Sequence, residues 1–265
     1  MFSKLMRRRH VDNNYVVHPP EDIDGIRNVA GMTAEILEII CHSVRPGMTA
    51  FDLDQFAGKV INDHGGASAF YNYQGFPGQI CISINDEVVH GIGRQERVIQ
   101  IGDIVSIDCG VRQDGFIGDT AKTVSVGPLV GQVADLMSVT ERSLMAGIDA
   151  AVGGNTVKDI GCAIEKMVSA SGYGVVRDFV GHGCGRKLHE PPEVPNYPTR
   201  KSTELLRSGM ILALEPMVNM GTHKVKIDDD GWTVRTLDGG WSAHFEHMIL
   251  ITNGKPEILT WPRNQ

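Results

Sequence analysis

Hydrophobic residues recur every three or four positions in four stretches of the chain, which is the spacing of helices that bury one face. This pattern predicts helices over residues 21–44, 51–64, 129–152 and 156–171. Thr49 is a candidate N-cap for the second helix, and Gly65-Gly66 follows it as a stop. Thr156 opens the fourth helix, after Gly153-Gly154 ends the third.

Residues 102–123, GDIVSIDCGVRQDGFIGDTAKT, have the pattern of a β-hairpin with Asp114-Gly115 at its turn. Asp108 and Asp119 interrupt its apolar strands, and their separation of 11 positions is odd. An odd separation across the turn places both side chains on one sheet face, roughly 4.5–8 Å apart. Two carboxylates at that distance repel each other unless a cation lies between them. The hairpin alone leaves a second interpretation open, in which one aspartate caps the turn and the other is solvated.

The two halves of the chain share an order of features, which indicates an internal duplication. Residues 89–93, VHGIG, match residues 181–185, GHGCG, and residues 102–108, GDIVSID, match residues 209–215, GMILALE. Each half then has two helices, a histidine between or beside glycines, and an apolar strand that ends in a carboxylate. We expect two αβ halves, about 21–126 and 129–260, with the active groups at their interface.

Two further carboxylates interrupt strands that otherwise look buried. Glu215 ends an apolar run, and Glu246 lies within FEHMILI. A buried charge needs a partner, and no Lys or Arg lies within five residues of Glu215. Two divalent cations would neutralise Asp108, Asp119, Glu215 and Glu246 together. With His182 as a nitrogen ligand, this set favours manganese, iron(II), cobalt or zinc over copper. The alternative to a metal is that structural salt bridges neutralise these carboxylates.

Composition limits the class of protein. The chain has 265 residues, 42% hydrophobic and 22% charged, which suffices for a folded core. Its net charge of −7 argues against a general binder of nucleic acid or anionic membranes, apart from a basic stretch that includes Arg7-Arg8-Arg9. No run of about 18 apolar residues is present. Five scattered cysteines without a CxxC pair indicate a reducing compartment, and we expect a cytoplasmic protein.

Five stretches together resemble one known family. They are CISINDEVVHGIG, GDIVSIDCGVRQDGFIGDTAKT, GHGCGRKLHEPPEVPNY, LEPM and HFEHMIL. In this order they are similar to the type I methionine aminopeptidases of the pita-bread fold. The resemblance extends over residues 21–259 and implies an α+β pita-bread fold, with two pseudo-symmetric αβ halves around a central antiparallel sheet. It makes residues 19–265 one catalytic domain, preceded by a basic tail over residues 1–18.

The resemblance also implies a role for each site residue. Asp108 would chelate one of two divalent metal ions, Asp119 and Glu246 would bridge both, and His182 with Glu215 would complete the other. A water that bridges the metals would attack the first peptide bond, with Glu215 as proton shuttle. His90 and His189 would hydrogen-bond the substrate. The cofactors would be cobalt, manganese, iron(II) or zinc.

Specificity requires a small apolar pocket. By resemblance, Tyr73, Phe76, Cys81, His90 and Trp241 would line the pocket for the methionine side chain. Ordinary core packing is the alternative for Phe76 and Cys81. Relatives often carry an aromatic residue where this chain has Leu188, so we expect a differently shaped wall there.

The expected substrate is the N-terminal methionine of nascent chains whose second residue is small. Transient ribosome contact and a monomeric state follow from the resemblance alone, and no membrane or specific nucleic acid partner is expected. Three alternatives exist: prolidases and proline-specific aminopeptidases, which usually carry an additional N-terminal domain; type II methionine enzymes, which carry a helical insertion; and a non-enzymatic binding protein that has lost its ligands.

Overall fold

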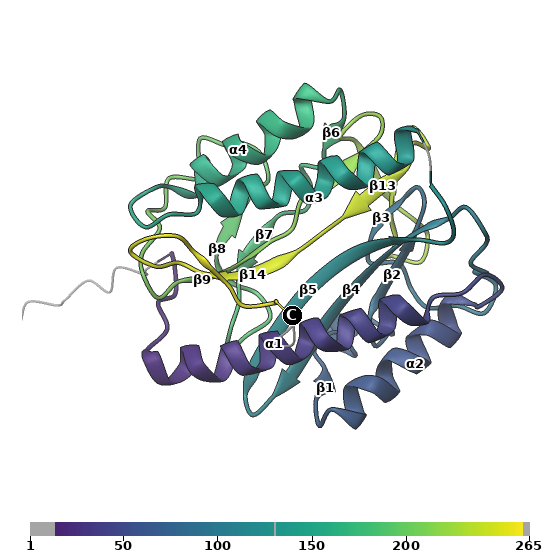
Figure 1. Ribbon diagram of the computed structural model, residues 1–265, viewed down its shortest axis with the longest axis horizontal. Helices are drawn as coiled ribbons and strands as arrows, with labels where there is room; N and C mark the ends of the chain where they lie inside the picture. The colour runs from purple at the N-terminus through teal and green to yellow at the C-terminus, as the bar shows by residue number, and fades with distance from the viewer. Residues whose placement is uncertain (1–13, 130, 262–265) are drawn as a thin grey trace, which may run out of the picture.

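The computed structural model describes residues 14–129 and 131–261 (Figure 1). Its helices are α1 (Pro20–Ser43), α2 (Ala50–Asp63), the 3₁₀ turn η1 (Tyr73–Gly75), α3 (Gln132–Ala150) and α4 (Val157–Ala170). The strands of the first half are β1 (Ala67–Ser68), β2 (Cys81–Ile84), β3 (Glu87–Val89), β4 (Ile104–Gln113) and β5 (Phe116–Ser125). Those of the second half are β6 (Gly174–Val175), β7 (Gly181–Gly183), β8 (Glu190–Val194), β9 (Ile211–Leu214), β10 (Met217–Asn219), β11 (Val225–Ile227), β12 (Val234–Thr236), β13 (Ser242–His244), β14 (His247–Leu250) and β15 (Glu257–Ile258).

All four predicted helices are present, and their starts follow from local chemistry. Thr49 caps α2, because its hydroxyl accepts a hydrogen bond from Asp52 N at 3.0 Å. At the start of α4, Thr156 N donates to the Asp159 carboxylate at 2.8 Å. The third helix begins at Gln132, later than predicted, directly after Gly131 at a φ of 67°.

The two halves have related architectures, as predicted. In Figure 1, α1 and α2 lie along one side of the strands, and α3 and α4 lie along the other. Every strand pair is antiparallel, and the hydrogen-bond ladders divide the described strands into four sheets with the orders β1-β4-β2 (β5 also pairs β4), β13-β10-β6, β11-β12-β3 and β15-β14-β9-β7-β8. The N-caps of α2 and α4 even form matching isolated bridges, Thr49 to Val98 and Thr156 to Leu205.

The halves meet along β5 and the segment that joins β13 to β14. Thr120 Oγ1 donates to Glu246 O at 2.7 Å, and Glu246 N donates to Ala121 O at 2.9 Å. On the other side of β5, α1 packs closely because Gly118 has no side chain: a Cβ there would lie 2.3 Å from Thr33 Oγ1. Hydrogen bonds from both backbone groups of Glu246 to β5 therefore fix its position against the first half.

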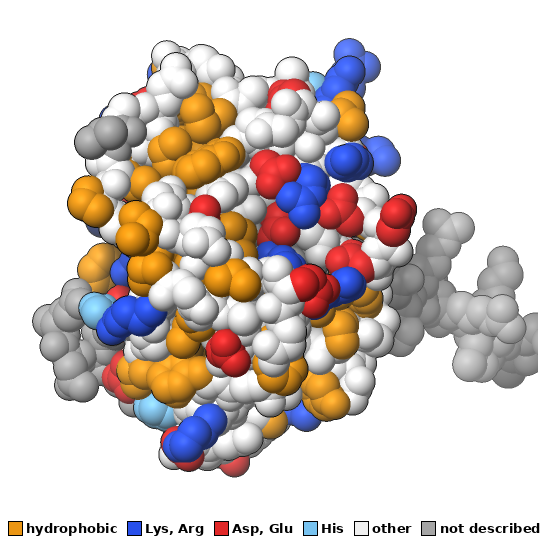
Figure 2. All heavy atoms as spheres, turned by 90° about the vertical axis from the view of Figure 1, so that its right-hand side faces the viewer, with side chains coloured by type: hydrophobic (Ala, Val, Ile, Leu, Met, Phe, Trp, Pro, Cys, Tyr) orange, Lys and Arg blue, Asp and Glu red, His pale blue; other side chains and the backbone are white. Residues whose placement is uncertain are grey.

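Residues 14–18, which the sequence assigns to the tail, pack against the second half. Val16 N donates to Pro191 O at 3.3 Å, and His18 lies 3.2 Å from the Glu190 carboxylate. The basic residues Arg7-Arg8-Arg9 lie outside the described residues. Within the described part, no helix is long and apolar enough to cross a membrane. On the face drawn in Figure 2, Lys and Arg side chains are interspersed with Asp and Glu, so this face has no continuous basic surface for phosphate.

Candidate metal centre

The β4–β5 hairpin brings the two aspartates together on one face. The strands pair Asp108 with Ala121 and Gly110 with Asp119. Asp108 and Asp119 are therefore diagonal neighbours two positions apart, on the same side of the sheet, as the odd separation predicts. Asp119 is 3% exposed, and Oδ1 of each carboxyl group is buried without a hydrogen bond.

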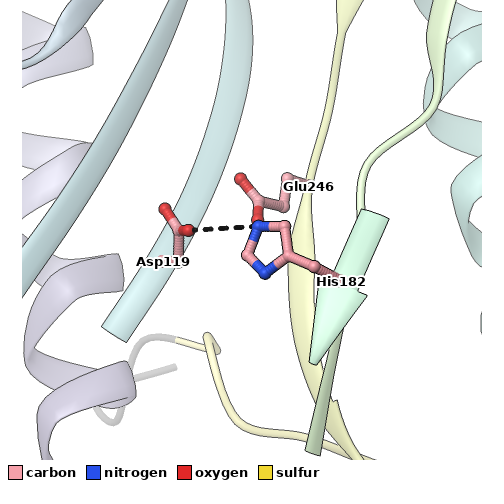
Figure 3. Close-up of side chains that lie close together, drawn as sticks. All are labelled: Asp119, His182 and Glu246. Carbon is pink, nitrogen blue, oxygen red and sulfur yellow. Dashed lines mark ion pairs between the residues drawn. The ribbon is translucent and has the colours of Figure 1, made fainter. Parts of the chain in front are cut away.

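The second half supplies three more candidate ligands. His182 lies on β7, Glu215 directly follows β9, and Glu246 lies between β13 and β14. His182 Nε2 is 3.4 Å from Glu215 Oε1 and 3.8 Å from Asp119 Oδ2. Figure 3 shows Asp119 of β5, His182 of β7 and Glu246 of the β13–β14 connection pointing toward one another. One ligand atom from each of these three lies within 4.8 Å of the others.

In the described part of the chain, no Lys or Arg side chain forms an ion pair with these acids. Asp108 Oδ1, Asp119 Oδ1 and Glu246 Oε1 are buried and have no hydrogen-bond partner among residues 14–129 and 131–261. Among the described residues, no Lys or Arg lines the cavity that all five candidate ligands share. Burying unpaired carboxylates this close together costs roughly several kcal/mol of folding free energy unless a cation is present. The donor set therefore fits divalent metal ions.

Burial opposes ionisation of these acids while no cation is bound. It raises the pKa of Asp108 to about 7. Burial first, and then the neighbouring carboxylates, raise the pKa values of Asp119, Glu215 and Glu246 well above their ordinary range. A metal ion reverses this balance because it favours the charged form, so metal binding releases protons.

His182 has the protonation state of a metal ligand. Its Nδ1 lies 2.9 Å from Gly183 O, and a carbonyl oxygen can only accept, so Nδ1 carries the proton. Burial, and secondarily His189, lower the pKa of His182 to about 3. The Nε2 lone pair is thus free and directed toward Glu215 and Asp119.

The remaining predicted catalytic histidines lie on the walls of the cavity. His189 is exposed at its edge, where Nδ1 lies 2.7 Å from the Tyr73 hydroxyl and the ring is 4.3 Å from that of His182. His90 adopts a φ of 59°. Only glycine fits at the next position, Gly91, because a Cβ there would lie 2.0 Å from Ile82 O. Burial, and then His189, lower the pKa of His90 to about 4. Burial also lowers the pKa of His189. Both pKa shifts favour the neutral ring near pH 7, which can donate or accept a hydrogen bond.

Sequence reasoning missed His244. Its Nε2 lies 3.9 Å from Glu215 Oε2 and has no hydrogen-bond partner among the residues that the structure describes. Burial, and then His90, lower its pKa to about 3. The signal was present in HFEH: His244 is two positions before Glu246 in a strand-like run.

A cavity of about 210 Å³ adjoins the acids. Tyr73, Phe76, Cys81 and His90 line it, as predicted for a pocket, and so does Leu188. The cavity also has aromatic walls that the sequence did not identify, Phe70, Phe179 and Trp232.

Trp241 does not line this cavity. Its ring packs against the core cluster of the second half, and its carbonyl accepts a hydrogen bond from Met220 N at 2.8 Å. That bond holds Trp241 beside the end of β10, on the second half's own core. Trp232 takes the predicted place instead, since its ring centroid lies 5.2 Å from that of Phe76.

Comparisons with known proteins agree with this geometry. The model of metallopeptidase family M24 matches residues 24–253. Methionine aminopeptidase of Clostridium perfringens is 47% identical over 240 residues, which cover 90% of this chain and 96% of that protein. The crystal structure of methionine aminopeptidase from Rickettsia prowazekii has a TM-score of 0.90 at 38% identity and covers 93% of this chain and 100% of that chain.

A prolidase from Pyrococcus furiosus shares the fold alone. It has a TM-score of 0.75 at 19% identity, and the match covers 94% of this chain but 66% of the prolidase. The family match, the sequence relatives and the fold therefore agree: the chain belongs to metallopeptidase family M24 and, within it, to the methionine aminopeptidases.

Proposed function

We propose that this protein is a metal-dependent aminopeptidase that removes the N-terminal methionine from proteins and peptides with a small second residue. The observation that carries the proposal is the juxtaposition of unpaired buried carboxylate oxygens with a mainly apolar cavity. The first feature binds cations, and the second accepts one uncharged side chain.

Two divalent ions would be held by Asp108, Asp119, His182, Glu215 and Glu246. When bound, they supply Lewis acidity that activates water and polarises the peptide carbonyl. Cobalt, manganese, iron(II) and zinc all suit this donor set.

The chain's own groups handle the protons and the orientation of the substrate. Glu215 takes a proton from the attacking water and delivers it to the leaving amine. His244 Nε2 lies 3.9 Å from Glu215 Oε2, and the lowered pKa of His244 keeps its ring neutral near pH 7. His189 and His90 hydrogen-bond the substrate carbonyl and the leaving-group side; the Tyr73 hydroxyl, 2.7 Å from His189 Nδ1, fixes the ring of His189.

The pocket selects the first residue. Phe76, Cys81 and Trp232 form aromatic and sulfur-containing walls that suit a thioether side chain. A wider hollow of about 1130 Å³ shares Val180, His182 and His189 with this pocket. The remainder of the polypeptide leaves the site through that hollow.

Nascent chains in the cytoplasm are the proposed substrates, with transient contact to the ribosome and a monomeric enzyme. All five cysteines are free, which suits a reducing compartment.

The test is a panel of short peptides assayed with metal-free and reconstituted protein. Methionine release from Met-Ala-Ser should require manganese or cobalt. It should be much faster than release of the first residue from Met-Leu-Ser or Ala-Pro-Ser. Faster cleavage of Ala-Pro-Ser would favour a proline-specific enzyme. Full activity after exhaustive chelation would refute the metal requirement.

A further inference from the structure

The tryptophan wall of the cavity is carried by the turn over residues 228–233. Asp228 closes this turn: its N–H donates to Thr233 O at 2.8 Å, its carbonyl accepts from Gly231 N at 3.0 Å, and its carboxylate pairs with Arg235 at 3.0 Å. Trp232 comes from the second half, between β11 and β12, yet its ring faces first-half side chains: the centroid distances are 5.2 Å to Phe76 and 6.4 Å to His90. Within residues 14–129 and 131–261, the indole N–H has no hydrogen-bond partner. The orientation of the ring therefore depends on where the turn holds its backbone.

Asp230 organises that turn. Its Oδ1 accepts hydrogen bonds from Trp232 N at 2.9 Å and from Thr233 N at 2.8 Å. Its Oδ2 accepts from Thr233 Oγ1 at 2.7 Å. One carboxylate thus fixes the backbone directly at Trp232 and at the residue after it.

Arg94 connects this turn to the first half. Its Nη2 donates to Asp230 Oδ2 at 3.2 Å. Arg94 follows His90 in the glycine-rich segment 90–94, so one short segment carries both a predicted catalytic histidine and the anchor for the opposite wall. The Arg94 side chain is 41% exposed and that of Asp230 is 15% exposed. A pair this exposed adds little to global stability, so its main effect is on geometry.

We propose that Arg94 and Asp230 are positioning residues that hold Trp232 against the pocket and thereby set selectivity for the side chain of the substrate's first residue. This inference rests on the proposed aminopeptidase function. The pair spans the two halves, so its loss lets the 228–233 turn move away from Phe76 and His90. The pocket then widens without any change in the metal ligands.

The conservative variants separate positioning from simple turn structure. Asp230→Asn keeps a side-chain oxygen for the two backbone N–H groups but removes the charge that attracts Arg94. Arg94→Ala removes the partner and leaves the turn's own bonds intact, and Arg94→Lys restores the charge. Lys59→Ala and Asp63→Asn are matched controls, because they break an exposed ion pair on α2, whose side chains are 71% and 57% exposed.

The kinetic test uses the manganese-loaded full chain and compares Met-Ala-Ser with Leu-Ala-Ser. We expect Arg94→Ala and Asp230→Asn each to raise KM for Met-Ala-Ser about fivefold with kcat nearly unchanged, because ground-state and transition-state binding are lost equally. Discrimination against leucine should fall, Arg94→Lys should recover part of it, and the double variant should be no worse than either single one. A fall in kcat at constant KM, or unchanged discrimination, would overturn the proposal.

A spectroscopic test does not depend on activity. In a Trp241→Phe, Trp261→Phe background, Trp232 is the single tryptophan left of the three in the sequence. Arg94→Ala should increase its quenching by acrylamide by about twofold relative to the Lys59→Ala control, because the ring moves toward solvent. Equal quenching would refute the positioning role even if no methionine peptide were cleaved, whereas an inactive parent protein with the expected quenching would refute only the proposed function.

Discussion

Two groups of charged side chains lie where the halves of this protein meet, and they differ in what neutralises them. Beside β3 and β12, Arg235 pairs with Asp86 at 2.6 Å, Asp228 at 3.0 Å and Glu87 at 3.0 Å, and Arg97 also pairs with Glu87. In the metal centre, four carboxylates converge, and no described Lys or Arg lines their cavity.

The difference distinguishes a structural cluster from a binding site. Burial raises the pKa of Glu87, but Arg97 and Arg235 offset part of that rise. For Asp119, Glu215 and Glu246, burial and mutual repulsion act in the same direction. Acids that the fold pairs with arginine hold the halves together, whereas acids that it leaves unpaired require a ligand.

Replacing Glu215 should have the largest effect on activity. Glu215→Gln keeps the size of the side chain but cannot shuttle protons, so we expect kcat for Met-Ala-Ser to fall about 10²- to 10⁴-fold. Stopped assays of methionine release measure the fall, with circular dichroism and metal content as controls on folding and loading. Wild-type turnover in the metal-loaded variant would remove Glu215 from the proton pathway.

Replacing Glu87 should affect stability and leave the metal centre intact. Glu87→Gln removes the negative charge that pairs with Arg97 and Arg235. The free energy of unfolding should therefore fall by about 3 kcal/mol. Urea denaturation measures this change. Manganese binding at 25 °C should match that of the wild type; a variant that stays fully stable but loses metal would erase the distinction between the two clusters.

Replacing Asp108 should stabilise the metal-free protein, and the gain should depend on pH. The pKa of Asp108 rises from its ordinary 3.8 to about 7, so ionisation is disfavoured in the folded state. The resulting loss of stability is absent below about pH 4, grows as pH rises and is complete above about pH 7. Asp108→Asn avoids this cost. We expect its free energy of unfolding to exceed that of the wild type by about 2 kcal/mol at pH 8 and to equal it at pH 4.

The control is to compare the stability of Asp108→Asn and the wild type in saturating manganese. At pH 8 the wild type should then be the more stable protein, because metal binding stabilises it more than it stabilises the variant. The histidines with lowered pKa values, including His90, act in the opposite direction in both proteins and cancel in the difference. A metal-free Asp108→Asn protein that is less stable than the wild type at pH 8 would show that burial does not disfavour ionised Asp108 as we infer.

Much of this site was predictable from local patterns in the sequence. The odd separation of Asp108 and Asp119 placed them on one face without knowledge of the fold, because strand periodicity is two. The glycine and threonine signals around the helices located α2 and α4 to within one residue. Glu215 and Glu246 stood out because each interrupts an apolar strand.

The walls of the pocket were less predictable, because irregular segments position them. The sequence gives no reason to prefer Trp232 over Trp241; only the turn at Asp230 and the bond from Met220 to Trp241 decide which ring reaches the cavity. Residues 14–18 were also not predictable. Only the contacts of Val16 and His18 with Pro191 and Glu190 show that this segment packs against the second half.

Calorimetric titration of the metal-free protein with manganese tests the central claim most directly, namely that Asp119 and Glu246, which the fold brings together, bind divalent cations. We expect binding of two ions per chain with release of protons, and loss of most of this binding in Asp119→Asn, while Asp63→Asn on the surface of α2 binds like the wild type. Absence of binding by the wild-type protein, or equal binding by Asp119→Asn, would contradict the account.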